Sequence, residues 1–257
     1  FRAVGSSANC ASAMIVLNTI MAKQLKEFKI SVDARIEKGD AKDEAILKEL
    51  QKLIKESKKI RFEGNGYGEE WVKEALKRGL SNHMDTPRAL NVWGDKKVAK
   101  LFEEMEVLTS RELLARQEID FENYVMKVQI ESRLINEISQ NIILPAVVEY
   151  QNQLIKNIQG LQSVLGEKAG TAAAKSQLAI LDRITTHMNK MIDLNLDMLN
   201  ARKEANKIQD YHKRAEAYCD KVKVYFEEIR YNADKLEMLV DDELWPLPKF
   251  REMLFTK

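Results

Sequence analysis

Apolar residues recur every three or four positions along most of this 257-residue chain. That period places them on one face of an α-helix. The first such stretch ends near Ile36, before a Gly39-Asp40 turn, and its apolar stripe is Met14, Leu17, Met21, Leu25 and Phe28. A second stretch covers about residues 43–59, and its single apolar stripe is Ile46, Leu47, Leu50, Leu53 and Ile54. We expect the two helices to form a hairpin.

A long helix is predicted for the middle of the chain. Thr109 and Glu112 have the spacing of a capping box, in which each side chain reaches the other's backbone N–H at the start of a helix. The apolar stripe that follows extends to about Leu161. Pro145 interrupts it and predicts a kink, because proline lacks a backbone N–H and crowds the preceding turn. Three glycines then predict a loop region, namely Gly160, Gly166 and Gly170.

Residues 171–240 contain neither proline nor glycine, and their apolar positions keep the helical period throughout. A single straight helix of that length would extend roughly 100 Å. We therefore expect it to bend, to break near residues 206–210, or to project from the body. Pairing with the helix of residues 109–161, as in a coiled coil, would bury both stripes. The methionines and tyrosines of the stripe, and the nearby His187 and His212, are interpreted as packed or surface residues.

Two short segments invite a catalytic interpretation. Residues 64–68, GNGYG, contain three glycines, but no Lys-Ser/Thr follows and the dinucleotide-binding spacing is not met. We interpret them as a tight turn before a helix of residues 69–78 that Gly79 closes. Residues 81–88 are polar and are predicted to form a loop that Trp93 anchors at its end. His83 and Asp85 lie near each other in this loop and could form an acid–base pair. No third group is evident to orient that histidine, so we interpret it as solvated.

Composition narrows the function classes. The 41 basic and 40 acidic residues give a net charge of +1, which argues against a nucleic acid or a membrane surface as the main partner. Cys10 and Cys219 form no metal or redox motif, which fits a reducing cytoplasm. The longest apolar run, near residues 11–22, is too short to span a membrane. No hydrolase, protease or nucleotide-loop motif is present, and three widely spaced histidines cannot make an ordinary zinc site. Residue chemistry alone therefore indicates an all-helical interaction or assembly segment.

The two ends of the chain carry the most specific sequence. Residues 1–4 alternate like the end of a strand, and Ser6, Ser7 and Asn9 are turn and N-cap residues. We expect a strand whose beginning is missing, then a polar turn and the first helix. The C-terminal end, LWPLPKFREMLF at residues 244–255, is apolar enough that we expect it to pack against this chain's body or a neighbouring subunit.

These segments resemble the C-terminal portion of the long, type III form of bacterial glutamine synthetase. The resemblance rests on residues 1–7 and 14–20, on RFEGNGY at residues 61–67, on GLSN at residues 79–82 and on the ending at residues 244–255. It implies a mainly α fold of long helical hairpins in a coiled-coil-like bundle, appended to the truncated end of an α+β catalytic domain. Residues 1–40 would then be the end of that catalytic domain and residues 41–257 a helical extension.

The resemblance also implies an activity for the full-length enzyme, a ligase that forms glutamine from glutamate and ammonia with ATP and Mg²⁺ or Mn²⁺. In the family a strand ends Glu-x-Arg, where the Glu binds metal and the Arg binds glutamate and the transferred phosphoryl group. Here Phe1 and Arg2 match the last two positions, so Arg2 is the substrate-binding candidate. The resemblance assigns no catalytic, nucleotide-binding or metal-binding residue to this chain.

The family assembles as a double-ringed homo-oligomer in the cytoplasm. Because the chain has long paired apolar stripes, balanced charge and no catalytic motif, we expect this segment to be mainly structural and inactive alone. The alternative is a stand-alone helical coiled-coil assembly or adaptor module without catalysis.

Overall fold

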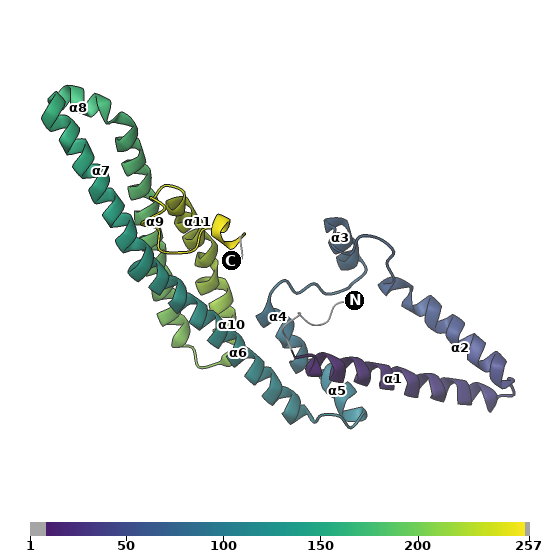
Figure 1. Cartoon of the computed structure of the whole chain (residues 1–257). Helices are drawn as coiled ribbons and strands as arrows, with labels where there is room; N and C mark the ends of the chain where they lie inside the picture. Colours follow the sequence, from purple (N-terminus) through teal and green to yellow (C-terminus); the bar gives the residue numbers. More distant parts are fainter. Residues whose placement is uncertain (1–8, 255–257) are drawn as a thin grey trace. The chain divides into compact units, whose positions relative to one another are not determined.

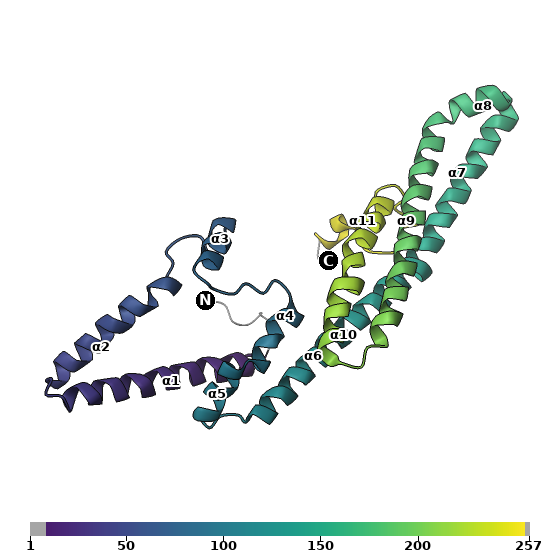
Figure 2. The same cartoon turned by 180° about the vertical axis from the view of Figure 1, so that it is seen from behind.

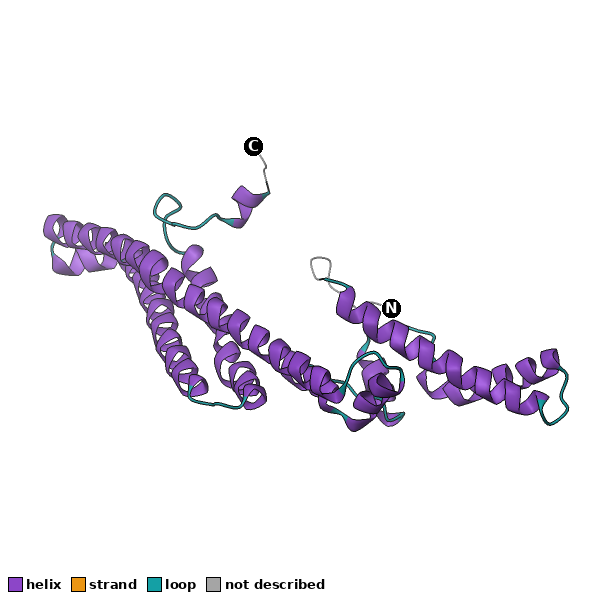
Figure 3. Ribbon diagram, turned by 90° about the horizontal axis from the view of Figure 1, so that it is seen from below, coloured by secondary structure: helices purple, strands orange, loops and turns teal. Residues whose placement is uncertain are grey.

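A computed structural model of the chain describes residues 9–254, all of them as helices, turns and loops (Figure 3). The mainly α prediction is therefore confirmed for these residues. The predicted strand at residues 1–4 lies outside the described residues, and the appended catalytic domain stays a prediction. The chain divides into two compact units, Phe1–Asp120 and Phe121–Lys257. The resemblance implied a different division, with the end of a catalytic domain at residues 1–40 and a helical extension at residues 41–257. That division also stays a prediction.

The first unit begins with the expected hairpin of α1 (Ala11–Ile36) and α2 (Lys42–Glu56), seen in Figure 1. Gly39 makes the turn between them with a φ of 104°, a conformation that residues with a Cβ rarely adopt. After the hairpin come short helices, namely η1 (Ser57–Ile60), α3 (Glu69–Lys77), α4 (Thr86–Leu90), η2 (Asn91–Gly94) and α5 (Lys96–Glu104). Asp95 caps α5, because its carboxylate accepts the Lys97 N–H at 2.6 Å.

The packed face of α2 differs from the predicted stripe. Ala45 and Glu49 are the buried residues of this helix, whereas Leu47, Leu50 and Ile54 are about half exposed. The small Ala45 side chain lets the two helices approach, and Glu49 fills the interface with an ion pair to α1. Most of the apolar stripe therefore lies on the surface of this chain, and only Ile46 and Leu53 of it are half-buried. The stripe of α1 is likewise open, since Met14, Leu17, Met21 and Leu25 are 41–60% exposed.

The second unit contains the long helices. α6 (Ser110–Glu137) begins in the first unit, and the predicted capping box is present at its start. The Glu112 carboxylate accepts both the N–H and the hydroxyl of Thr109 at 2.8 Å. After it come η3 (Ile138–Ile143), α7 (Leu144–Leu165), α8 (Glu167–Ala173), α9 (Lys175–Asn206), α10 (Tyr211–Ala217), η4 (Tyr218–Val222), η5 (Lys223–Tyr225), α11 (Phe226–Glu237) and α12 (Phe250–Met253).

In this unit α9 lies between α7 and α11, and the arrangement is visible from both sides (Figures 1 and 2). The predicted pairing of α9 with the preceding long helix is thus present along α7, and α11 adds a third helix. The core contains Met191, Met198 and Tyr218 of the stripe as predicted, whereas Met188 and Tyr225 are half-buried and Tyr211 is exposed. The residues that are completely or almost completely buried in this unit include Val147, Ile184, Met191, Met198, Tyr218, Val222 and Leu236.

The interruption predicted at Pro145 takes the form of a wider turn. Residues 138–143 are a π-helix that continues directly into α7, and Pro145 is the second residue of α7. The loop predicted around three glycines is wrong for two of them. Gly160 lies inside α7 and Gly170 inside α8; only Gly166, with a φ of 81°, makes a turn. A Cβ at Gly170 would lie 2.4 Å from the Gln162 Cα, so this glycine permits close helix packing.

The helix predicted for residues 171–240 is broken near residues 206–210, which was one of the three alternatives. α9 ends at Asn206, and α10 starts after Asp210, whose carboxylate accepts the Lys213 N–H at 2.8 Å. Past α11 the chain turns back. Trp245 is only 7% exposed, and the Lys249 ammonium donates to the Glu237 carbonyl. This part of the apolar end therefore packs against the chain's own body, while Met253 and Leu254 are exposed.

Candidate functional site

Arg2, the substrate-binding candidate, lies outside the described residues, so its role stays a prediction. The helix that follows it in the chain, α1, is described from its first turn. Asn9 starts that helix, because its side-chain oxygen accepts the Ala11 N–H at 2.8 Å. Asn9 is thus a turn residue as expected, whereas its predicted N-cap position is wrong because Cys10 is the N-cap residue of α1.

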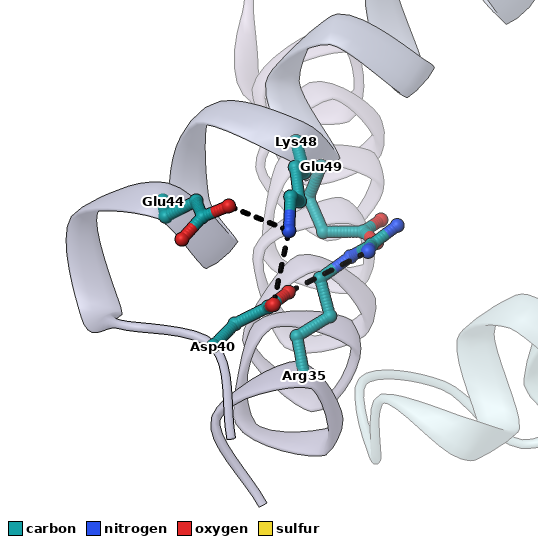
Figure 4. A network of polar contacts seen from close by, with 5 residues as sticks. All are labelled: Arg35, Asp40, Glu44, Lys48 and Glu49. Atoms are coloured by element: carbon teal, nitrogen blue, oxygen red, sulfur yellow. Dashed lines mark hydrogen bonds and ion pairs between the residues drawn. The ribbon is translucent and has the colours of Figure 1, made fainter. Parts of the chain in front are cut away.

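A network of five charged residues joins the far end of α1 to α2 (Figure 4). Arg35 donates from its Nε to the buried Glu49 carboxylate, and its Nη1 is 3.8 Å from Asp40. Lys48 in turn contacts Asp40 at 2.9 Å and Glu44 at 2.8 Å. Hydrogen bonds to Glu44 and Asp40 raise the pKa of Lys48. Every charge in the network meets an opposite one, so it closes the hairpin and leaves no group free for chemistry.

The glycine-rich segment is a turn, as predicted. The Asn65 side-chain oxygen accepts the Tyr67 N–H at 3.0 Å, and Gly68 is the residue before α3. Gly79 then closes that helix with a φ of 80°. A phosphate-binding loop needs N–H groups converging on one point, and here the turn's own side chain uses one of them.

His83 lies close enough to Asp85 to lower the pKa of that carboxyl through its charge, but the hydrogen bonds of the Asp85 carboxylate come from Arg88. The Asp85 carboxylate caps α4, because it accepts the Arg88 N–H at 2.9 Å and the Arg88 guanidinium at 2.8 Å. Burial raises the pKa of Asp85, but the two hydrogen bonds from Arg88 outweigh it, and the net pKa lies below the usual range. The carboxylate is thus committed to a helix end, which supports the interpretation of His83 as solvated.

The other two histidines are packed, as expected. The His212 ring lies 5.2 Å from the Phe121 ring, and the His187 Nδ1 lies 3.0 Å from the Asn232 side-chain oxygen. Cys10 and Cys219 are both free thiols. Within residues 9–254 no three His, Cys, Asp or Glu side chains gather as metal ligands, and no helix is both long and apolar enough to cross a membrane. The described residues therefore do not fit the metal that the resemblance implies.

One concave charged site does not follow from the sequence pattern. A cavity of about 890 Å³ lies where α2 ends and α3 ends, and all seven residues that line it are charged: Lys55, Glu56, Lys58, Lys59, Arg61, Glu63 and Arg78. The run of lysines at residues 55–59 has the pattern of an ordinary solvated helix face. The signal that could have singled it out is its position before RFEGNGY, whose turn brings Arg78 back to the same place.

Comparison with known proteins identifies the class of domain first. Residues 45–162 match the family of the glutamine synthetase C-terminal domain. This range starts in α2 and ends in α7. This part of the chain is therefore similar to a glutamine synthetase C-terminal domain, and the resemblance recognised from the sequence is confirmed.

Similarity to individual glutamine synthetases extends over the whole chain. Over all 257 residues, the chain is 44% identical to a glutamine synthetase of Bacteroides fragilis (strain YCH46). Over the same residues it is 30% identical to a type-3 glutamine synthetase of Dictyostelium discoideum. A glutamine synthetase of Butyrivibrio fibrisolvens is 29% identical over 235 residues, or 91% of the chain. The chain spans about a third of the length of these relatives, 33–35%.

Proposed function

We propose that this chain works as the C-terminal part of a glutamine synthetase that ligates ammonia to glutamate at the expense of ATP. The observation that carries the proposal is the 44% identity to a glutamine synthetase over every residue of the chain. The remaining two-thirds of such an enzyme would hold ATP and Mg²⁺ or Mn²⁺, because the described residues gather no metal ligands. Arg2 would bind glutamate, and the protein would act in the cytoplasm.

The segment's own contribution is proposed to be structural. The α1 stripe and the α2 stripe are both exposed, although each has the composition of a packed face. Apolar faces of this extent normally contact other protein. The rest of the enzyme would cover the apolar stripes of α1 and α2. Other parts of the chain would contact neighbouring subunits of a double-ringed homo-oligomer.

Two variants of the complete enzyme test this proposal. Replacing Arg2 by Lys should abolish most glutamine formation while the oligomer stays intact, because lysine lacks the planar guanidinium that binds carboxylate and phosphoryl oxygens in pairs. Deleting residues 244–257 should reduce the oligomer's size in light scattering. Full activity and an unchanged assembly in both variants would contradict the proposal.

The chain by itself should form no glutamine from glutamate, ammonia and ATP. Measurable turnover by the purified 257-residue chain would show that it holds a complete active site. A complete gene that encodes only this helical chain would favour the alternative, a stand-alone assembly or adaptor module.

A further inference from the structure

We propose that the cavity between the ends of α2 and α3 binds a small phosphate-bearing anion. This charged cavity, lined by the seven residues named above, has five cationic and two acidic side chains. Glu74 pairs with Arg78 at 2.7 Å, which leaves a formal excess of two positive charges. The proposal does not depend on the proposed ligase activity, because it concerns binding to this chain alone.

The lysines of the cavity have no counter-ion of their own. Lys55, Lys58 and Lys59 are exposed, and none of them forms an ion pair with any residue from 9 to 254. Elsewhere in the first unit most clustered charges are compensated, as in the Arg35–Glu49 network. Like charges that share a concave surface repel one another, and a bound anion relieves that repulsion.

The two arginines are fixed in place before any ligand binds. Arg61 donates through Nη2 to the Ile54 carbonyl at 2.9 Å, and Arg78 donates through Nη1 to the Arg61 carbonyl at 3.0 Å. The Arg78 guanidinium also lies 5.5 Å from the centre of the Trp71 ring, which stacks on Phe62 at 4.1 Å. Each guanidinium has five N–H donors, so several stay available. Fixed donors of this kind lower the entropic cost of binding.

The chemistry of the lining selects the kind of ligand. All lining residues are charged, so a ligand would meet ammonium, guanidinium and carboxylate groups, with only the hydrocarbon stems of these side chains between them. Guanidinium and ammonium groups together match the oxygens of phosphate, to which arginine donates in pairs and lysine as a point charge. A compact di- or trianion such as pyrophosphate therefore fits better than an acidic peptide.

Titration calorimetry of the 257-residue chain with inorganic pyrophosphate at 0.15 M salt tests the proposal. We expect one saturable site per chain. Replacing both Lys58 and Lys59 by Met should weaken binding at least about tenfold, because two of the phosphate-facing charges are lost. The matched control replaces two exposed lysines of the second unit, Lys127 and Lys190, by Met and should leave the affinity unchanged.

Three outcomes would overturn the proposal. They are the absence of saturable binding, an equal loss of affinity in the control pair, and tighter binding of an acidic peptide than of pyrophosphate. Unfolding temperatures of both double variants should not fall below that of the parent chain, since none of the four lysines makes an ion pair within residues 9–254. A Lys55→Met variant provides a second measurement if the Lys58/Lys59 pair lowers the unfolding temperature, and it too should weaken pyrophosphate binding.

Discussion

Glu49 of α2 accepts a hydrogen bond from the Arg35 Nε of α1, and this carboxylate is one of the few charged groups buried in the described chain. The pair joins two helices at positions 14 residues apart in the sequence. It occupies the place that an apolar pair would take in an ordinary hairpin. The hairpin therefore depends on a charge interaction near the C-terminal end of α1.

Replacing Glu49 by Gln should destabilise the hairpin by about 1–3 kcal/mol. Breaking a buried pair leaves an uncompensated charge, but Arg35 is about a third exposed, so solvent and Asp40 reduce the loss. Urea unfolding measures the change. The control Glu44→Gln removes an exposed pair and should cost less than about 0.5 kcal/mol. The double variant Arg35→Met/Glu49→Leu should recover stability, and a further loss in it would contradict this account.

The hairpin shows where sequence reasoning succeeds and where it stops. The Gly39 turn and both helices follow from local patterns, because glycine and helical periodicity act within a few residues. The face that packs does not follow, since burial of Ala45 and Glu49 is set by α1 and not by the composition of α2 itself. A polar residue at the centre of an interface gives no apolar signal.

Gly170→Ala should destabilise the second unit by about 1–3 kcal/mol, because the new methyl group would lie 2.4 Å from the Gln162 backbone and would force α7 and α8 apart. Gly160→Ala is the matched control. Gly160 lies in α7, and a methyl group added there would meet no neighbouring atom within 4 Å, so alanine should be neutral or stabilising by up to about 1 kcal/mol. Thermal unfolding compares the two, and equal effects would exclude the close packing of α7 and α8 as the cause.

Asp120→Asn should stabilise the chain slightly at neutral pH. Burial raises the pKa of Asp120, and Arg116 only partly offsets this. A carboxyl whose pKa is higher in the folded state adds stability below its unfolded pKa, and loses that contribution as the pH rises through its folded pKa. The variant should therefore unfold about 1 °C higher at pH 7 and match the parent near pH 3. The exposed control Glu118→Gln should show no such trend.

Thr109→Ala should lower the unfolding temperature by roughly 2–4 °C at pH 7, because it removes a helix cap. Hydrogen bonds from the Thr109 N–H and hydroxyl hold the pKa of Glu112 below its usual value. A depressed pKa adds stability above the unfolded pKa, and this is lost as the pH falls through the folded pKa. The difference between variant and parent should therefore shrink in acid, and a difference that grows there would contradict the capping box.

This capping box was predictable from the sequence because its two residues interact within one turn. The charged cavity was not, because it needs Arg78 to return beside Lys59, 19 residues earlier in the chain. The break of the long pattern at residues 207–210 was one of three alternatives, and the choice depends on how α9 and α11 pack. Interactions within a few residues thus predict the helices and their caps. Contacts between distant segments decide which helix face is buried and where the charged cavity forms.

The π-helix before Pro145 has a consequence for the spacing of the core. Ser139, Ile143 and Val147 are all buried at intervals of four residues. In a regular α-helix each four-residue step overshoots a full turn by about 40°, so three such positions would drift off one face. The wider turn accommodates roughly one extra residue and cancels this drift. Residues before and after it therefore face the same neighbour, and deleting one of residues 138–143 should restore a regular α-turn there while α7 keeps its face toward α9.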